Sequence, residues 1–152
     1  MLGNDIVDLN LAKIQSNWRR KNYLDKIFTT EEQLLIAWAN DPDEMVWLLW
    51  SMKESAYKIH NRKTGIRDFS PKSLNCAVYE DSLGEVNINN CTYFTKSNIQ
   101  TTFIHTIAAP VFDKLAAVKV AIYELPDHPD DYKRTQPASV SHHGQYLALV
   151  YQ

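Results

Sequence analysis

The stretch WLLWSMKESAYKI contains an acid and a base within an otherwise largely apolar run. Glu54 and Lys58 are four residues apart, the spacing at which side chains meet on one face of a helix. Such a pair is commonly a surface ion pair that stabilises a helix by about 0.2–0.5 kcal/mol. Trp47 and Trp50 fall on the same face, and an idle charge in such a dry environment is costly. Taken alone, the pair is interpreted as a surface ion pair, and the neighbourhood weakens that interpretation in favour of a functional site.

Asp5, in LGNDIVDL, is a second candidate. An acid at the start of a strand often only satisfies a turn, and Asp8 points to the opposite side of an ideal strand. Magnesium prefers one or two carboxylates, completed by phosphate oxygens and water. Asp5 and Glu54 would suffice if the fold joins them, although no spacing rule shows that it does.

His142, in SVSHHG, is the third candidate. A lone histidine in a turn is usually structural or solvated, and His143 could play either role. The other three histidines, His60, His105 and His128, have no spacing that indicates zinc. The sequence also has no Gly-rich phosphate loop, nucleophile elbow or Cys-His pattern.

Local signals predict the helices that must position these side chains. Thr29 followed by Glu32 is a capping-box pattern, and it predicts a helix over about 30–39. A weakly periodic segment predicts an earlier helix over roughly 11–21.

The main helix carries the acid and the base. Asp41 is its expected N-cap and Pro42 its first residue, and it should continue to about residue 61. Its other face has apolar residues at alternating spacings of four and three, which predicts a core stripe: Met45, Leu49, Met52, Ala56 and Ile59.

Strands are predicted at the start of the chain and throughout its second half. LGNDIVDL resembles a short strand, and after Gly65 the pattern changes to period two. Segments 73–80, 84–90, 91–96, 100–108 and 115–125 are predicted strands, with Gly84 and Asn89–Asn90 as turns; two short strands follow a Pro- and charge-rich loop within 138–152. These elements predict an α+β fold, with the N-terminal strand and helices packed on a mostly antiparallel sheet in a single domain over 1–152.

Composition limits the possible partners and location. The chain has 152 residues, 45% of them hydrophobic, and a formal charge of −2, so its total charge does not favour nucleic acid or an anionic membrane. Two cysteines without CxxC spacing are expected to be reduced. No secretory signal or membrane-spanning stretch is seen, so we expect a cytoplasmic protein.

Four segments, in order, resemble the 4′-phosphopantetheinyl transferases of the small holo-acyl-carrier-protein synthase type. GNDIVDL is similar to their G-I-D-I-V-E opening, and KIFTTEEQ to their F-T-x-x-E segment. WSMKESAYK resembles W-x-x-K-E-A-x-x-K, and SVSHHGQYLALV resembles the closing S-x-S-H segment. The resemblance spans the chain except for its middle.

The resemblance implies an activity and a site. The family transfers the 4′-phosphopantetheine arm of coenzyme A to a serine of an apo acyl or peptidyl carrier protein, requires Mg²⁺, releases adenosine 3′,5′-bisphosphate, and serves pathways such as fatty-acid biosynthesis. By this resemblance, the metal ligands are Asp5 and Glu54, the catalytic residues are Glu54 and Lys58, and the coenzyme contacts are Lys53, Lys58, Ser141 and His142.

The resemblance also implies an assembly and a docking surface. Small members are trimers with shared sites, so His142 is expected to come from a neighbouring copy. The alternative is that segment 89–113 fills the interface and leaves a monomer with a self-contained site. Carrier proteins are acidic beside their serine, so a basic cluster containing Lys13, Arg19 and Arg20 could steer docking. A solvated helix face is the alternative.

Two departures and two other functions stay open. Val7 stands where the two-lobed members have a second acid. Of the glycine-rich turn that follows the helix in the small type only Gly65 is present, and segment 89–113 is extra sequence. The same acids would also suit a Mg²⁺-dependent phosphohydrolase, which would form product without a carrier. A weak family member that only binds a carrier is the non-enzymatic alternative.

Overall fold

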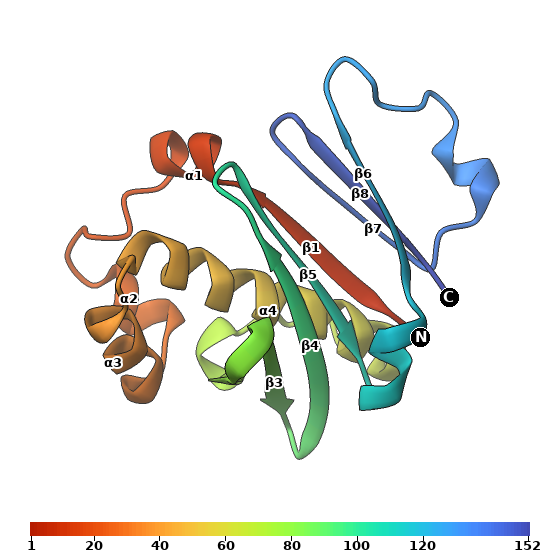
Figure 1. Cartoon of the computed structure of the whole chain (residues 1–152). Coiled ribbons are helices and arrows are strands. Elements are labelled where there is room, and N and C mark those ends of the chain that lie inside the picture. Colours follow the sequence, from red (N-terminus) through yellow and green to blue (C-terminus); the bar gives the residue numbers. More distant parts are fainter.

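The computed structural model describes all 152 residues. Its helices and strands, in chain order, are β1 (Gly3–Asp8), α1 (Leu9–Gln15), α2 (Tyr23–Ile27), α3 (Thr30–Trp38), α4 (Pro42–Thr64), β2 (Asn75–Val78), β3 (Leu83–Ile88), β4 (Cys91–Ile99), β5 (Phe103–Ala109), β6 (Lys119–Glu124), β7 (Ser139–His143) and β8 (Tyr146–Tyr151) (Figure 1). Short 3-10 turns occur at Pro71–Ser73, Glu80–Ser82, Phe112–Ala117 and Tyr132–Thr135.

The strands form two antiparallel sheets. The larger has the order β1-β5-β4-β3-β2 and the smaller β6-β8-β7. Figure 1 shows α4 running along one face of the larger sheet, with the smaller sheet on the other side of β1. The α+β expectation is confirmed, but the predicted strands divide between two sheets. β1 has a backbone ladder only with β5. The last three strands therefore do not extend the larger sheet and form the sheet β6-β8-β7.

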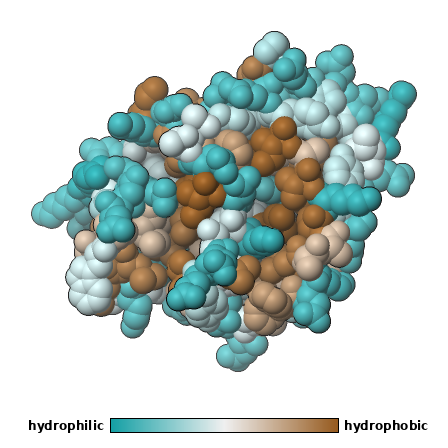
Figure 2. Space-filling view, viewed as in Figure 1, coloured by the Kyte–Doolittle hydropathy of each residue, from teal (hydrophilic) through white to brown (hydrophobic).

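The main core lies between α4 and the larger sheet. The predicted stripe is correct, because Leu49, Met52, Ala56 and Ile59 are fully buried in this cluster and Met45 is partly buried against it. A second cluster on the outer face joins Leu2, which precedes β1, to strands of both sheets. Figure 2 shows apolar side chains in the middle of the face viewed in Figure 1, with polar side chains around them.

The helix starts agree with their local signals. Thr29 and Glu32 form the complete capping box, and the Asp41 side chain accepts a hydrogen bond from the Glu44 N–H. The predicted end of α4 was three residues early, since the helix continues to Thr64 and stops at Gly65, whose φ of 73° is left-handed. The first helix ends at Gln15 rather than near residue 21, and α2 was not predicted.

The strand predictions hold with one correction to the turns. Gly84 lies within β3 and pairs with Thr95, so it is not a turn. Asn89 and Asn90 do form a turn, with φ of 46° and 64°. Segment 89–113, unmatched by the motifs, contains β4 and β5, the centre of the larger sheet.

Close packing of β1 on α4 depends on small side chains. A Cβ at Gly3 would overlap the carbonyl oxygen of Ser55, so only glycine allows the strand to lie this near the helix. Ser51 donates a hydrogen bond to the Asp5 carbonyl at 3.3 Å. This contact holds the backbone of Asp5 against the helix that carries Glu54.

None of the helices is both long enough and apolar enough to cross a membrane.

Candidate active site

The second edge of β1 is closed by side chains of β7. Each of three alternate β1 amides donates a hydrogen bond to a β7 side chain: Asn4 N–H to Ser139 Oγ at 3.2 Å, Ile6 N–H to Ser141 Oγ at 3.0 Å, and Asp8 N–H to His143 Nδ1 at 2.9 Å. We call this boundary the β1–β7 seam. Because both strands advance by two residues per bond, they run in the same direction without a backbone ladder.

Two bases from α4 bridge the carbonyls of the seam. Arg62 donates to the carbonyls of Leu2 at 2.8 Å and Ala138 at 3.1 Å. Lys58 donates to the carbonyls of Asn4 at 2.6 Å and Val140 at 3.4 Å. One turn earlier on the same helix face stands Glu54, an acid. The α4 face against the seam therefore changes from base to acid at Glu54.

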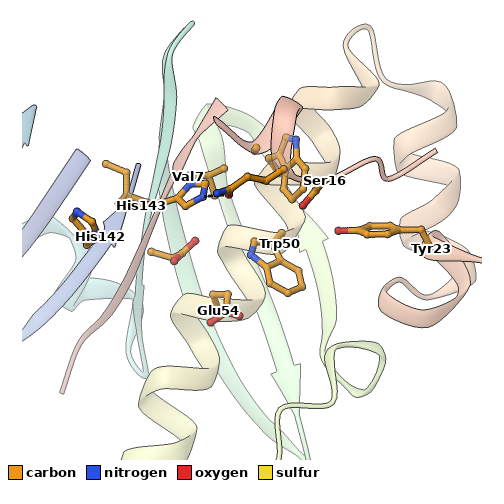
Figure 3. Close-up of a pocket in the computed structure, with 12 residues that line it drawn as sticks. Val7, Ser16, Tyr23, Trp50, Glu54, His142 and His143 are labelled. Atoms are coloured by element: carbon orange, nitrogen blue, oxygen red, sulfur yellow. Dashed lines mark hydrogen bonds between the residues drawn. The ribbon is translucent and has the colours of Figure 1, made fainter. Parts of the chain in front are cut away.

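A cleft of ≈ 410 Å³ lies beside this acidic end of the seam (Figure 3). Its lining comes from five elements: Asp5, Ile6 and Val7 of β1, Ala12, Gln15 and Ser16 of and after α1, Tyr23 of α2, Trp47, Trp50 and Glu54 of α4, and His142 and His143 of β7. The fold thus brings together Asp5, Glu54 and His142, the three candidates from distant parts of the sequence.

The Asp5 carboxylate is held at one oxygen and left without a partner at the other. Oδ1 accepts a hydrogen bond from Ser141 Oγ at 3.2 Å and lies 4.0 Å from Lys58 Nζ. Oδ2 is buried and has no hydrogen-bond partner. Burial raises the pKa of Asp5 to about 7, opposed by the Lys58 charge and assisted by Glu54. A cation bound at Oδ2 would offset this unfavourable burial.

Glu54 completes a pair of acids in the cleft. Burial raises the pKa of Glu54, while the charge of Lys58 lowers it. No cluster of three or more His, Cys, Asp or Glu side chains is positioned to hold a metal alone. Two carboxylates, one with a partnerless oxygen, nevertheless fit Mg²⁺, which usually keeps water and ligand phosphate oxygens in its shell. Val7 lines the cleft where a third acid is absent.

Lys58 lies behind Asp5 rather than in the lining of the cleft. Its ammonium group contacts two backbone carbonyls and the Asp5 carboxylate, and its side chain keeps 27% exposure. Burial lowers the pKa of Lys58, and Asp5 and Glu54 oppose that change. Lys58 therefore fixes the seam and supplies positive charge to the acidic pair.

Lys53 does not belong to the site, and its prediction as a coenzyme contact is wrong. Its side chain is fully buried, with Nζ 2.8 Å from Glu32 Oε2. Three backbone carbonyls, those of Ile27, Pro71 and Leu74, also accept hydrogen bonds from Nζ. One residue along a helix is a rotation of about 100°, so Lys53 points to α3 while Glu54 faces the cleft.

His142 reaches the cleft from the same chain. It lines the cleft together with Asp5 and Glu54, and Figure 3 shows it beside His143 on the β7 side. One chain therefore already supplies His142, which agrees with the alternative of a self-contained site, and sharing between copies stays a prediction. The cause is the seam, which places β7 of the same chain against β1. His128 packs edge-on to His142, with ring centroids 5.6 Å apart.

His143 and Asp8 are structural parts of this wall. Because His143 Nδ1 accepts from a backbone N–H, its neutral ring carries the proton on Nε2, which faces Gln15 Oε1 at 3.2 Å. Burial lowers the pKa of His143.

Asp8 accepts hydrogen bonds from the N–H groups of Leu11 and Gln145, each at 3.1 Å. A Cβ at Gly144 would overlap the Asp8 carboxylate.

The side of the cleft opposite the histidines has no local signal in the sequence. Tyr23 points into the cleft from α2, across from His142 and His143 (Figure 3). Its helix is only five residues long, too short for a periodic signal. Trp47 and Trp50 were located correctly on the face of Glu54, and both line the cleft. Aromatic side chains therefore form its apolar wall.

The basic cluster is partly neutralised. Arg19 makes two hydrogen bonds to Asp43, at 3.0 and 3.2 Å, and stacks on Trp18. This arginine lowers the pKa of Asp43. Arg20 lies over the ring of Tyr23 and has no ion-pair partner. Arg20 and the exposed Lys13 are therefore the available charges.

Together the fold and cleft define a class of protein: an α+β chain whose first strand and longest helix each bring a carboxylate to one aromatic-walled cleft. The model of the 4′-phosphopantetheinyl transferase superfamily matches residues 1–115. The chain belongs to this superfamily, which confirms the resemblance of the motifs. The matched residues end before β6, so the smaller sheet with Ser141 and His142 lies outside them. No curated protein matches the chain.

Solved holo-acyl-carrier-protein synthases have a similar fold. The enzyme of Neisseria meningitidis has a TM-score of 0.58 and 18% identity, covering 70% of this chain and 94% of its own. The Helicobacter pylori enzyme, solved in complex with coenzyme A, has a TM-score of 0.57 and 14% identity over 72% of this chain and 98% of its own. The Thermotoga maritima enzyme covers 97% of this chain and 81% of its own, with a TM-score of 0.54 and 10% identity.

Proposed function

We propose that the protein transfers 4′-phosphopantetheine from coenzyme A to a serine hydroxyl of an apo acyl or peptidyl carrier protein. The observation that carries the proposal is the pairing of Asp5 and Glu54 in one cleft, with the buried Asp5 Oδ2 lacking a partner. Membership of the superfamily and the fold shared with a coenzyme A-bound synthase support the same activity.

The bond changes follow from the chemistry of coenzyme A. The carrier serine oxygen attacks the phosphorus that bears the pantetheine arm, and a new P–O bond forms. The bond from that phosphorus to the bridging oxygen breaks, and adenosine 3′,5′-bisphosphate leaves with the electron pair. The serine proton passes to Glu54 directly or through water, and Glu54 is within the cleft that holds the phosphates in this proposal.

Asp5 and Glu54 would hold Mg²⁺, which supplies charge stabilisation at the pyrophosphate oxygens when bound. Lys58 lies 4.0 Å from Asp5 and limits the negative charge of the two acids. Direct contact of Lys58 with a phosphate stays a prediction from the resemblance, because Lys58 is outside the cleft lining. Phosphoryl transfer needs mainly positioning and electrostatic stabilisation, and these side chains supply both.

The walls of the cleft suit the rest of the substrate. We propose that His142 lies against the coenzyme and that Trp47, Trp50 and Tyr23 exclude water from the reacting phosphate. Arg20, which lies over the ring of the cleft residue Tyr23, and Lys13 of α1 would attract an acidic carrier protein. We also propose that the carrier belongs to fatty-acid biosynthesis and that the reaction takes place in the cytoplasm.

Assembly as a homotrimer stays a prediction from the resemblance. The cleft does not depend on it, because all three of Asp5, Glu54 and His142 come from one chain. We therefore propose that a single chain is the catalytic unit, whatever assembly it joins.

Mass spectrometry of carriers tests the function. The protein is incubated with coenzyme A, Mg²⁺ and several apo carriers, and each carrier is weighed. Addition of one phosphopantetheine to a carrier, dependent on its serine, is expected. Release of adenosine 3′,5′-bisphosphate without any carrier would identify a phosphohydrolase instead, and carrier binding without transfer would identify a non-catalytic member.

A further inference from the structure

We infer that Ser141 is a positioning residue for Asp5. Its hydrogen bond determines which oxygen of the Asp5 carboxylate faces a divalent cation. The inference rests on the proposed function for the identity of that cation as Mg²⁺. It assigns Ser141 a role different from the coenzyme contact that the resemblance implies.

The hydrogen bonds of Ser141 fix the direction of its hydroxyl group. Ser141 Oγ is 3.0 Å from the Ile6 nitrogen and 3.2 Å from Asp5 Oδ1. The Ile6 N–H can only donate, so it occupies an acceptor lone pair of Oγ. The single hydroxyl proton is then free to donate to the ionised Asp5 carboxylate.

This bond distinguishes the two oxygens of Asp5. Oδ1 accepts from Ser141 and lies near Lys58, whereas Oδ2 is buried without a partner. Rotation of the carboxylate would break the bond to Ser141. Ser141 therefore presents Oδ2 to a cation, in the way that hydrogen-bonded neighbours orient ligating carboxylates at metal sites.

Ser141 itself is poorly placed to contact a coenzyme. Its residue is only 6% exposed, and its hydroxyl has the two partners just described. It is not part of the cleft lining, whereas the next residue, His142, is. The coenzyme-facing position of this pair is therefore His142.

Ser139 provides a matched control on the same strand face. Its Oγ accepts from the Asn4 N–H at 3.2 Å, which is the same type of seam contact. Arg62 also approaches this Oγ, at 3.4 Å. Ser139 has no contact with Asp5, so its removal weakens the seam without releasing the carboxylate.

The test compares cation binding in the full chain carrying Ser141→Ala, Ser141→Thr or Ser139→Ala. Mn²⁺ is the probe, and its dissociation constant is measured by electron paramagnetic resonance without coenzyme or carrier. Ser141→Ala is expected to weaken Mn²⁺ binding about 10–100-fold. Ser141→Thr keeps the hydroxyl and should bind within about twofold of the unsubstituted protein, as should Ser139→Ala. Thermal unfolding checks that each variant is folded, and Ser141→Cys, with a weaker donor, replaces Ser141→Ala if that variant does not fold.

Several outcomes would overturn the inference. These are unchanged Mn²⁺ binding in Ser141→Ala, equal weakening in Ser139→Ala, or no loss of binding in Asp5→Ala, which would place the ion elsewhere. In transfer assays, an increase confined to the KM for coenzyme A would instead identify a coenzyme contact. Mn²⁺ binding that follows the expected pattern in a protein without transferase activity would support the role of Ser141 and reject the proposed function.

Discussion

Lys53 and Glu32 form an ion pair that is fully enclosed, with 2.8 Å between Nζ and Oε2 and side-chain exposures of 0% and 1%. Glu32 also accepts hydrogen bonds from the Thr29 and Cys76 N–H groups. Every polar atom of this pair thus has a partner, and the network joins α3, α4 and the start of β2. It holds together the helical half of the molecule and does not touch the cleft.

Lys53→Met should therefore reduce stability and spare the chemistry. Leaving Glu32 buried without its cation is expected to lower the free energy of unfolding by about 3–5 kcal/mol. The double variant Glu32→Gln, Lys53→Met removes the uncompensated charge and should recover part of that loss. Urea denaturation measures both. The KM for coenzyme A of the folded Lys53→Met protein should stay within about twofold, and a large rise would restore Lys53 as a coenzyme contact.

Asp5→Asn and Glu54→Gln should each reduce transfer by about 100-fold or more, because direct ligands exceed the 10–100-fold effects of their neighbours. Both changes keep side-chain shape, so the fold should persist. Carrier mass spectrometry at limiting Mg²⁺ measures the effect. Near-normal turnover of either variant would contradict the assignment of the two ligands.

The pH dependence of metal-free stability should follow Asp5. Its pKa is raised to about 7 in the folded chain but is about 3.9 in an unfolded one. Between these values the folded state binds more protons, so the free energy of unfolding falls as pH rises through this window. This group alone accounts for a decrease of at most about 4 kcal/mol. Urea denaturation at a series of pH values should show the decrease in the unsubstituted protein.

Asp5→Asn is the control for this titration. The variant cannot ionise at residue 5, so its stability curve should be flatter between pH 4 and 7. Added Mg²⁺ should stabilise the unsubstituted protein more at pH 8 than at pH 5, because protons compete for the carboxylates at the lower pH. The same slope in both proteins without metal would contradict the environment described for Asp5.

Activity should not be restored by mixing subunits. Asp5 and His142 line one cleft within one chain, so Asp5→Ala and His142→Ala each damage every site. A mixture of the two inactive variants, held under conditions that allow any oligomer to exchange, should stay inactive. Recovery of transfer in the mixture would show that His142 acts across a subunit interface.

Charge reversal at Arg20 and Lys13 should weaken binding of the carrier protein and leave binding of coenzyme A unchanged. Neither side chain is held in an ion pair, whereas Arg19 is bound to Asp43. Arg20→Glu with Lys13→Glu should raise the KM for the carrier several-fold, mainly at low salt, because long-range attraction is screened by ions. The KM for coenzyme A should be unchanged.

Lys114→Glu gives the same change of sign outside α1 and α2 and should leave both KM values unaltered. An equal rise in the carrier KM for Lys114→Glu would indicate a general charge effect. No rise in the double variant would place carrier docking elsewhere.

Local signals in the sequence were sufficient for much of the fold. Thr29 and Glu32 lie within one helical turn, so their capping box could be predicted before any packing was known. The order of strand segments was equally visible, because period-two patterning is local. The division of the strands into two sheets was not visible in the sequence, because it depends on which strand edges remain free in the fold.

The candidate site was predictable by residue type but not by geometry. Lys53 and Glu54 are neighbours in one motif, yet the carbonyls that enclose Lys53 belong to Ile27, Pro71 and Leu74. No spacing rule connects these positions. For the same reason no local pattern predicts the contact of Ser141 with Asp5, which spans 136 residues.

The β1–β7 seam should open before the rest of the protein unfolds. Its bonds join residues 135 apart, and closing such a long loop is entropically costly. The seam also lacks the cooperative backbone ladder that holds β5 to the other edge of β1. We therefore expect β7 to detach in partial openings that leave the helical core intact, as weakly connected units do. In hydrogen exchange, the Asn4, Ile6 and Asp8 amides should then lose protection before those of α4, and Asp5 would lose its alignment at the same moment. Inactivation should accordingly precede unfolding when the protein is warmed.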